Sequence, residues 1–257
     1  MGALEAALRA RRDQGGKAFV PYVTGGFPGV DADLLRAIAD AGADAIEVGV
    51  PHSDPIIDGG VIQQASSAAL AAGARPADVF ATIREATLDV PVAVMTYVNP
   101  VLRRGVDAFL DDVAEAGVSG MIVPDLPVDE AESFDAACAA RDIDAVLLAA
   151  PGAAVERLEA IAGRARGFVY CVAVYGVTGA REELGDTAES LIGALRPMTD
   201  LPLLVGVGIG TPRQAARTNE FADGVIVGSA LMAKLVQGDR EAMLELARDF
   251  RQALPLG

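Results

Sequence analysis

Short apolar runs alternate along the chain with segments of helical periodicity. Eight runs predict buried strands: Ala18–Val23, Ala45–Val50, Val92–Tyr97, Gly120–Val123, Ala145–Leu148, Phe168–Val172, Leu203–Gly206 and Gly224–Val227. Between the runs, apolar residues recur every three or four positions, which predicts helices such as Asp31–Ala41, Val106–Ala116, Ala131–Ala140 and Glu156–Ala165. Because this alternation favours a parallel sheet, eight such units predict an α/β fold of the (β/α)8 TIM barrel type.

An open doubly wound sheet is the alternative fold. Such sheets carry a Gly-x-Gly-x-x-Gly turn after the first strand, whereas Thr24–Gly29 reads Thr-Gly-Gly-Phe-Pro-Gly. No linker or low-complexity tract divides the chain, so we predict one barrel domain over residues 1–257. Residues 1–16 are amphipathic and charged, and we interpret them as an extra N-terminal helix closing the bottom of the barrel rather than as a transit peptide.

Composition narrows the classes of partner. The formal net charge of −15 disfavours nucleic acid, and no apolar run is long enough to cross a bilayer. Any anionic ligand must therefore be held by local groups rather than by the overall field. The two cysteines, Cys138 and Cys171, lack metal-ligand spacing, which indicates a reduced, cytoplasmic protein. Nothing in the sequence requires a metal or a cofactor.

A carboxylate stands inside the second apolar run, at Glu47. Burying an unpaired carboxylate is costly, and no basic residue lies close to it in sequence. Ile46 and Val48 face the opposite side of the strand, so Glu47 points either at the helices or, more tolerably, into the mouth of the barrel. A structural glutamate paired with a buried base is the alternative. We predict that Glu47 is catalytic, with a pKa raised by burial toward the range of proton transfer.

Two long loops follow predicted strands, Pro51–Gln64 and Tyr175–Ser190, and long loops in compact barrels are often functional. In the first loop, Asp54 precedes a proline and is typical of a turn. Asp58 suits a helix N-cap as well as a functional carboxylate, and its spacing does not decide between them. His52 is the only histidine, and we interpret it as incidental because no catalytic or metal-binding pattern accompanies it.

Glycine-rich segments follow three successive strands late in the chain: Gly176–Gly179, Gly206–Gly210 and Gly228–Ser229. Glycine lets the backbone approach an anion, and a helix N-terminus offers free N–H groups. Phosphate sites of these barrels often lie after the seventh and eighth strands. Each segment alone could simply be a turn, but together they predict a site for a phosphorylated small molecule.

The segment Ile46–Gly59 resembles the catalytic strand and loop of the tryptophan synthase alpha subunit family. Supporting segments are Met95–Pro100, Pro124–Pro127, Gly176–Gly179 and Gly228–Ala230, and the resemblance extends from Phe19 to about Phe250. It implies a (β/α)8 barrel lyase without a cofactor of its own, which cleaves indole-3-glycerol phosphate to indole and glyceraldehyde 3-phosphate. It also implies a beta subunit as partner, in an alpha-beta-beta-alpha assembly.

The resemblance also implies roles for ten residues. Glu47 matches the catalytic glutamate, and Asp58 matches the aspartate that holds the indole nitrogen. The substrate-binding residues that it implies are Tyr22 and Tyr97 lining the indole pocket, Tyr170 near the substrate, Thr178 in the mobile loop, and Gly179, Gly208, Gly228 and Ser229 in the phosphate cradle.

The chain departs from the family pattern at several of these segments. Gly60 and Val61 replace a Pro-Thr pair beside the catalytic aspartate, and His52 replaces a loop aromatic. The remaining departures are Val174-Tyr175, where an arginine is common, and Val207, where a bulky aromatic is usual. These changes leave three other hypotheses open: a stand-alone lyase releasing free indole, a degenerate subunit that only activates a beta chain, and a different phosphate-binding barrel such as an isomerase.

Overall fold

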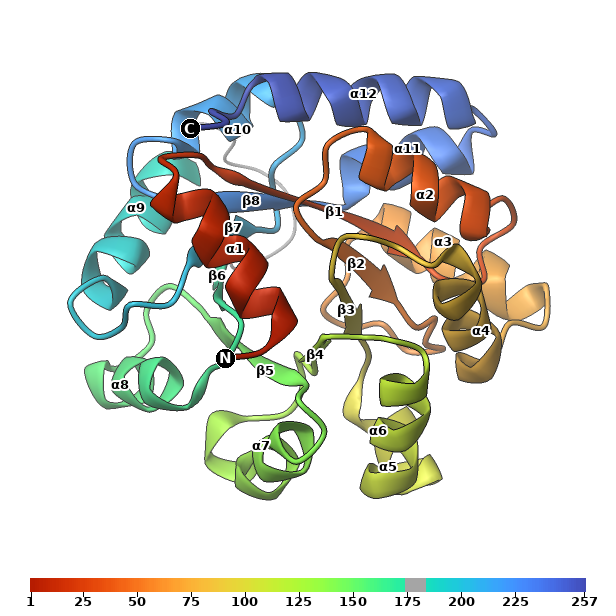
Figure 1. Ribbon diagram of the computed structural model, residues 1–257, viewed down its shortest axis with the longest axis horizontal. Helices are drawn as coiled ribbons and strands as arrows, with labels where there is room; N and C mark the ends of the chain where they lie inside the picture. Colours follow the sequence, from red (N-terminus) through yellow and green to blue (C-terminus); the bar gives the residue numbers. More distant parts are fainter. Residues whose placement is uncertain (174–183) are drawn as a thin grey trace.

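The computed structural model describes residues 1–173 and 184–257. Eight parallel strands, each hydrogen-bonded to the next, close into a barrel in which β8 pairs with β1 (Figure 1). The strands are β1 (Ala18–Thr24), β2 (Ile46–Gly49), β3 (Val92–Met95), β4 (Gly120–Ile122), β5 (Asp144–Ala149), β6 (Val169–Val172), β7 (Leu203–Gly206) and β8 (Gly224–Val227). The predicted (β/α)8 barrel is therefore confirmed, with all eight strands in their predicted places.

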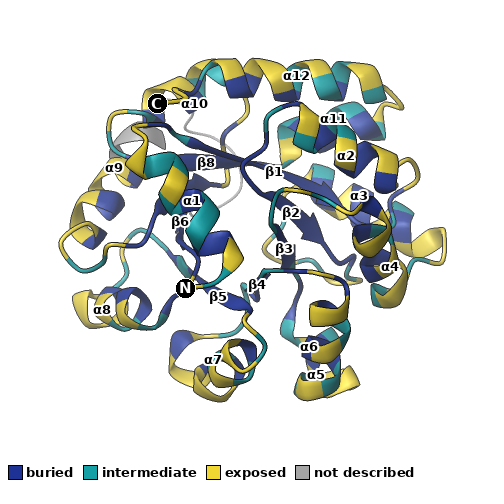
Figure 2. Ribbon diagram, in the orientation of Figure 1, coloured by how far each residue is buried: buried dark blue, intermediate teal, exposed yellow. Residues whose placement is uncertain are grey.

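Helices surround the barrel with their exposed faces turned outward (Figure 2). They are α2 (Ala32–Asp40), α3 (Gly60–Ala71), α4 (Pro76–Ala86), α5 (Val98–Arg104), α6 (Val106–Glu115), α7 (Glu132–Ala139), α8 (Val155–Arg164), α9 (Leu184–Leu195), α10 (Pro212–Thr218), α11 (Ser229–Val236) and α12 (Arg240–Gln252), with a 3-10 turn at Val128–Glu130. The four helices predicted by range agree to within one or two residues. Asp31 caps α2, because its side chain accepts a hydrogen bond from the Leu34 N–H at 2.7 Å.

Three predicted boundaries were wrong. The third strand ends at Met95 instead of Tyr97, because the chain turns there into the short helix α5. Both long loops are shorter than predicted, since α3 already begins at Gly60 and α9 at Leu184. In each case a helix begins where the predicted strand or loop was extended too far, because the first residues of a helix show little periodicity of their own.

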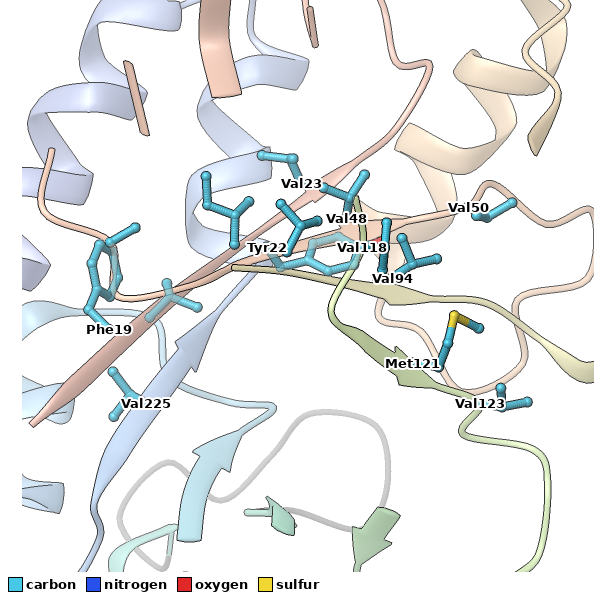
Figure 3. Close-up of a cluster of buried hydrophobic side chains, with 14 of the residues drawn as sticks. Phe19, Tyr22, Val23, Val48, Val50, Val94, Val118, Met121, Val123 and Val225 are labelled. Carbon is cyan, nitrogen blue, oxygen red and sulfur yellow. The ribbon is translucent and has the colours of Figure 1, made fainter. Parts of the chain in front are cut away.

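Side-chain alternation along the strands divides the core into two layers. Outward-facing residues belong to the larger core cluster, and Figure 3 shows the side chains of Val48, Val94 and Met121, on β2 to β4, within it. Inward-facing residues fill the barrel, and they include Ala45, Ala93 and Ile122. Small interior residues, Ala45 just before β2 and Ala93 on β3, leave space for the larger interior side chains of Phe168 and Tyr170.

Helix α1 (Ala3–Asp13) closes the N-terminal end of the barrel, as predicted, and lies across the strands in Figure 1. Its Leu4 and Leu8 are buried with the inward-facing strand residues. A β-carbon on Gly120, the first residue of β4, would collide with Leu4. This end is plugged with apolar side chains, so a ligand site must form at the opposite end, where the strands finish.

None of the described helices is long and apolar enough to cross a membrane.

Candidate active site

Glu47 lies inside the barrel. It is two residues from Ala45, an inward-facing residue, and alternation along β2 turns both side chains to the same side. Only 1% of Glu47 is exposed, and its Oε2 atom has no hydrogen-bond partner among the described residues. Burial raises the pKa of Glu47 to about 8, and the nearby charge of Asp58 adds to the rise. The group therefore keeps its proton at neutral pH, as a general acid requires.

Two buried tyrosines share this interior space. Tyr22 on β1 is paired in register with Glu47, and the Tyr22 hydroxyl lies 3.3 Å from the Thr24 hydroxyl. Tyr170 on β6 is 5% exposed, and burial raises its pKa well above the ordinary value, with the charge of Glu47 as the next cause. Both phenols are consequently neutral, and they form apolar walls with a polar tip around the carboxyl group.

Glycines at the ends of two strands make room for these rings. A β-carbon on Gly49 would collide with the Tyr22 hydroxyl, and one on Gly206 would collide with the Tyr170 ring. Neither glycine was singled out for this role from the sequence. The available signal was a glycine inside an otherwise β-branched strand, which often marks a close approach of another group.

Asp58 does not cap the following helix. The N-cap of α3 is Gly59, which makes no side-chain capping bond. Instead, Asp58 Oδ2 accepts a hydrogen bond from the Tyr97 hydroxyl at 3.2 Å, and that hydroxyl accepts one from the Ile57 N–H at 3.1 Å. Burial raises the pKa of Asp58, while the bond from Tyr97 and the charge of His52 act in the opposite direction. The loop thus presents Asp58 as a carboxylate held near Glu47.

The loop histidine packs against the same tyrosine. The ring centroids of His52 and Tyr97 are 4.6 Å apart with an interplanar angle of 21°, a stacked arrangement. Sequence analysis assigned no role to His52, because no partner for it lies nearby in the chain. The stack joins the loop after β2 to the segment after β3, and only the fold reveals that juxtaposition.

The anion-binding candidates lie at the ends of β7 and β8. Ser229 begins α11, whose first turn has backbone N–H groups without partners inside the helix. Gly228 faces the Tyr22 ring, since a β-carbon there would lie 3.2 Å from Tyr22 Cδ1. Gly59 lies beside Ser229, since a β-carbon on Gly59 would lie 3.9 Å from Ser229 Oγ. The loop that carries Asp58 therefore reaches the start of α11.

The segment after β7 has an unusual backbone. Val207 has a φ of 64° and Gly208 a φ of 96°, and Val207 is 47% exposed. A β-branched residue in the left-handed region is strained. Two other predicted residues, Thr178 and Gly179, lie outside the described residues, as do Val174 and Tyr175.

The described residues of the site form no metal centre. Within residues 1–173 and 184–257, no cluster of three or more His, Cys, Asp or Glu side chains is arranged to hold an ion. Both cysteines are buried and unpaired, and burial raises the pKa of Cys138 to about 12, so neither thiol is a ready nucleophile. The chemistry available is that of two carboxyl groups among tyrosines, next to a helix N-terminus.

Comparison with known proteins identifies the family of the chain. The family model of the tryptophan synthase alpha chain matches residues 8–254. The tryptophan synthase alpha chain of Microcystis aeruginosa is 43% identical over 263 residues, covering 99% of this chain and all of that protein. That of Carboxydothermus hydrogenoformans is 47% identical over 226 residues, covering 86% of this chain and 85% of its own.

Solved structures lead to the same family. A tryptophan synthase structure from Mycobacterium tuberculosis superimposes with a TM-score of 0.91 at 39% identity, covering all of this chain and 99% of that one. The alpha subunit from Legionella pneumophila gives a TM-score of 0.89 at 32% identity, covering 98% of both chains. Alpha chains of this type partner with a beta subunit. On these matches the chain belongs to the tryptophan synthase alpha chain family, lyases that cleave indole-3-glycerol phosphate.

Proposed function

We propose that Glu47 and Asp58 carry out this cleavage as a pair with different protonation states. Protonated Glu47 gives its proton to C3 of the indole ring, which makes an indolenine cation. Ionised Asp58 accepts a hydrogen bond from the ring N–H and stabilises that positive charge. Glu47, now a carboxylate, takes the proton of the glycerol hydroxyl while the C–C bond breaks. The bond's electron pair returns to the ring, which leaves indole and the aldehyde of glyceraldehyde 3-phosphate.

One observation carries this proposal: the buried Oε2 atom of Glu47 has no partner, beside an aspartate that does have one. A carboxyl group left unpaired in an apolar interior is expensive to maintain unless the ligand completes its bonds. The higher pKa of Glu47 suits the acid, and the bonded environment of Asp58 suits the anion.

The remaining candidates hold the substrate in this proposal. Tyr22, Tyr97 and Tyr170 provide flat, largely apolar surfaces for an indole ring. Gly208, Gly228 and Ser229 offer a close-approaching backbone and a helix N-terminus to the phosphate group. Thr178 and Gly179 stay predictions as parts of the lid and the phosphate cradle. Holding both ends of the substrate fixes the scissile bond over Glu47 without taking part in the chemistry.

The test is indole release from indole-3-glycerol phosphate by the purified chain. Wild type is expected to release indole, and Asp58→Asn to reduce kcat by about 10²-fold or more, because a neutral amide cannot stabilise the cation. Asp54→Asn is the matched control, since it removes the same charge from an exposed position of the same loop. Equal activity of Asp58→Asn and wild type would contradict the proposed role.

We also infer that this chain docks on a beta chain in an alpha-beta-beta-alpha assembly. Three large apolar side chains are exposed: Ile56 at 74% and Ile57 at 49% in the loop that carries Asp58, and Leu102 at 60% on α5. Exposed apolar side chains gathered beside a site are typical of a surface that a partner covers. We further propose that the chain is one domain and works in the cytoplasm.

Titration with a tryptophan synthase beta chain tests the docking. Saturable activation of indole release is expected, weakened by Ile56→Asp and little changed by Val155→Asp, which alters an apolar residue that is 57% exposed on α8. High turnover that no beta chain changes would favour the stand-alone lyase instead. A chain that activates the beta chain while Glu47→Ala has no effect in any assay would favour the degenerate subunit.

A further inference from the structure

His52 is connected to Asp58 through one other side chain, that of Tyr97. Its ring lies on the Tyr97 ring, with centroids 4.6 Å apart, and the Tyr97 hydroxyl donates to Asp58 Oδ2 at 3.2 Å. The same hydroxyl receives the Ile57 N–H at 3.1 Å, which ties it to the backbone next to Asp58. A ring that restrains Tyr97 therefore restrains the orientation of the carboxylate.

The surroundings of this stack are acidic. Its titratable neighbours are Asp54 and Asp58 on the loop, Glu47 on β2 and Tyr97 after β3, and Asp125 after β4 acts on Tyr97. Within the described part of the chain, His52 supplies the basic charge that acts on Asp58. Imidazole is the side chain whose ordinary titration falls between pH 5 and 8. When protonated, this ring places a positive charge that favours the ionised form of Asp58.

We propose that His52 is a positioning residue for the cleavage: its ring holds Tyr97 against Asp58, and its charge, when protonated, keeps Asp58 ionised in mild acid. This inference rests on the proposed role of Asp58 as the anion beside the indole nitrogen. His52 touches neither the reacting carbon atoms nor Glu47 in this scheme, so it acts only through its neighbours.

The sign of the effect follows from the charges. Proton uptake by Asp58 removes the anion that stabilises the ring cation, so activity falls on the acid side. A nearby imidazolium opposes that uptake, because it favours the charged form of the carboxyl group. The acid limb of kcat/KM therefore lies at lower pH with His52 than with an uncharged ring at this position.

The first test needs no substrate. His52 is the only histidine, so an untagged chain shows one imidazole Cε1 proton whose titration is followed by NMR between pH 5 and 8. Asp58→Asn is expected to move this NMR titration to lower pH, because a neighbouring anion is lost. Asp54→Asn, at the exposed position, is expected to move it by less than half as much. Equal shifts in the two variants, or none with Asp58→Asn, would overturn the inference.

The second test separates the ring from its charge. His52→Phe keeps a stacking ring and loses the charge, so kcat/KM near pH 8 is expected to stay within about twofold of wild type, while activity near pH 5.5 falls on the order of threefold further, the equivalent of half a pH unit. His52→Ala loses both features and is expected to be impaired at every pH, mainly through a higher KM. Circular dichroism melting confirms that both variants are folded.

The outcomes distinguish this inference from the proposed function. Superimposable acid limbs of His52→Phe and wild type, or equal activity of His52→Ala and His52→Phe at pH 8, would overturn the role of His52 and leave the roles of Glu47 and Asp58 intact. Absence of indole release by wild type would overturn the proposed function, whereas the NMR coupling would still report on His52 and Asp58.

Discussion

Asp44 and Glu47 lie three residues apart at the start of β2, and both are buried, yet their surroundings differ completely. Asp44, at the plugged end of the barrel, bonds to Arg11 Nε at 2.7 Å, to Arg251 Nη1 at 2.8 Å and to the Phe19 N–H at 2.9 Å. Glu47, facing the open end, has an oxygen with no partner. The same type of group is satisfied in one place and left unsatisfied three residues further along the chain.

The plugged end repeats this pairing. Asp223 bonds to Arg196 at 2.7 Å and Glu5 to Arg9 at 2.8 Å, and each carboxylate also receives a backbone N–H. Buried carboxylates at this end therefore join distant parts of the chain. The difference teaches how to separate structural from functional charges here. A buried carboxylate bonded to an arginine, or to a backbone N–H as Asp144 is to Glu5, stabilises the fold. Glu47, whose Oε2 atom has no partner among the described residues, is held for a ligand.

The largest effect is expected from Glu47→Gln. The amide cannot donate and accept the proton, so kcat for indole release should fall about 10²- to 10⁴-fold. Stability should not fall, because no paired charge is removed. Glu85→Gln, at an exposed position of α4, is the control for the same chemical change and should be as active as wild type. Activity of Glu47→Gln within a few fold of wild type would remove the functional half of the comparison.

Asp44→Asn is expected to lower stability and to leave activity unchanged. It leaves the buried Arg251 guanidinium without its anion, which should cost about 3–5 kcal/mol of unfolding free energy in urea titrations. Activity per folded molecule should be retained. Asp33→Asn, which breaks an exposed pair with Arg36, should cost less than about 1 kcal/mol. A loss at Asp44 no larger than that at Asp33 would show that the paired end does not carry stability.

The pH dependence of activity and of stability tests the protonated state of Glu47. Activity should fall about tenfold per pH unit above about 8, where Glu47 loses the proton it must donate. Its pKa is raised on folding from an ordinary 4.5, so the folded chain holds an extra proton between that value and 8. Stability should therefore decline as the pH rises through this window and level off above it.

Urea midpoints at pH 5, 6.5 and 8 check this sign. Wild type should lose stability relative to Glu47→Gln as the pH rises. Parallel curves for the two proteins would mean that Glu47 is not buried in its protonated form.

The smallest effect is expected from Val207→Gly at the open end. Val207 holds a φ of 64°, a conformation that glycine adopts without strain. Relief of strain, partly offset by the freedom of glycine in the unfolded chain, should stabilise by about 1 kcal/mol in thermal unfolding. Asp142→Gly, at a φ of 56°, should gain less because aspartate tolerates this region better. A lower Tm for Val207→Gly than for wild type would mean that the backbone at Val207 is not strained.

Much of the fold could be predicted from local pattern. Runs such as Leu203–Gly206 and Gly224–Val227 are buried on both faces, so their apolar character marks them wherever they lie in space. Helix starts beside turns were predicted less well: the third strand was extended to Tyr97, which is the N-cap of α5, and the start of α3 was taken for a loop. The first residues of a helix carry too little periodicity to be separated from the flanking segment.

The site residues also differ in how far the sequence predicted them. Glu47 was evident because a carboxylate inside an apolar strand contradicts its local surroundings. Asp58 was ambiguous, and the structure removes the helix-cap alternative, since Gly59 takes that place. Its hydrogen bond comes from Tyr97, 39 residues away, and no local spacing encodes that bond.

The sequence by itself determined the barrel, the family and the carboxylate inside an apolar strand, because each is encoded in neighbouring residues. Tertiary structure alone decided which buried charges have partners. Arg251 reaches Asp44 across 207 positions of the chain, and the His52 ring after β2 meets Tyr97 after the neighbouring strand β3. Barrel closure brings such residues together, so the physical difference between a structural and a functional carboxylate appears only once the chain has folded.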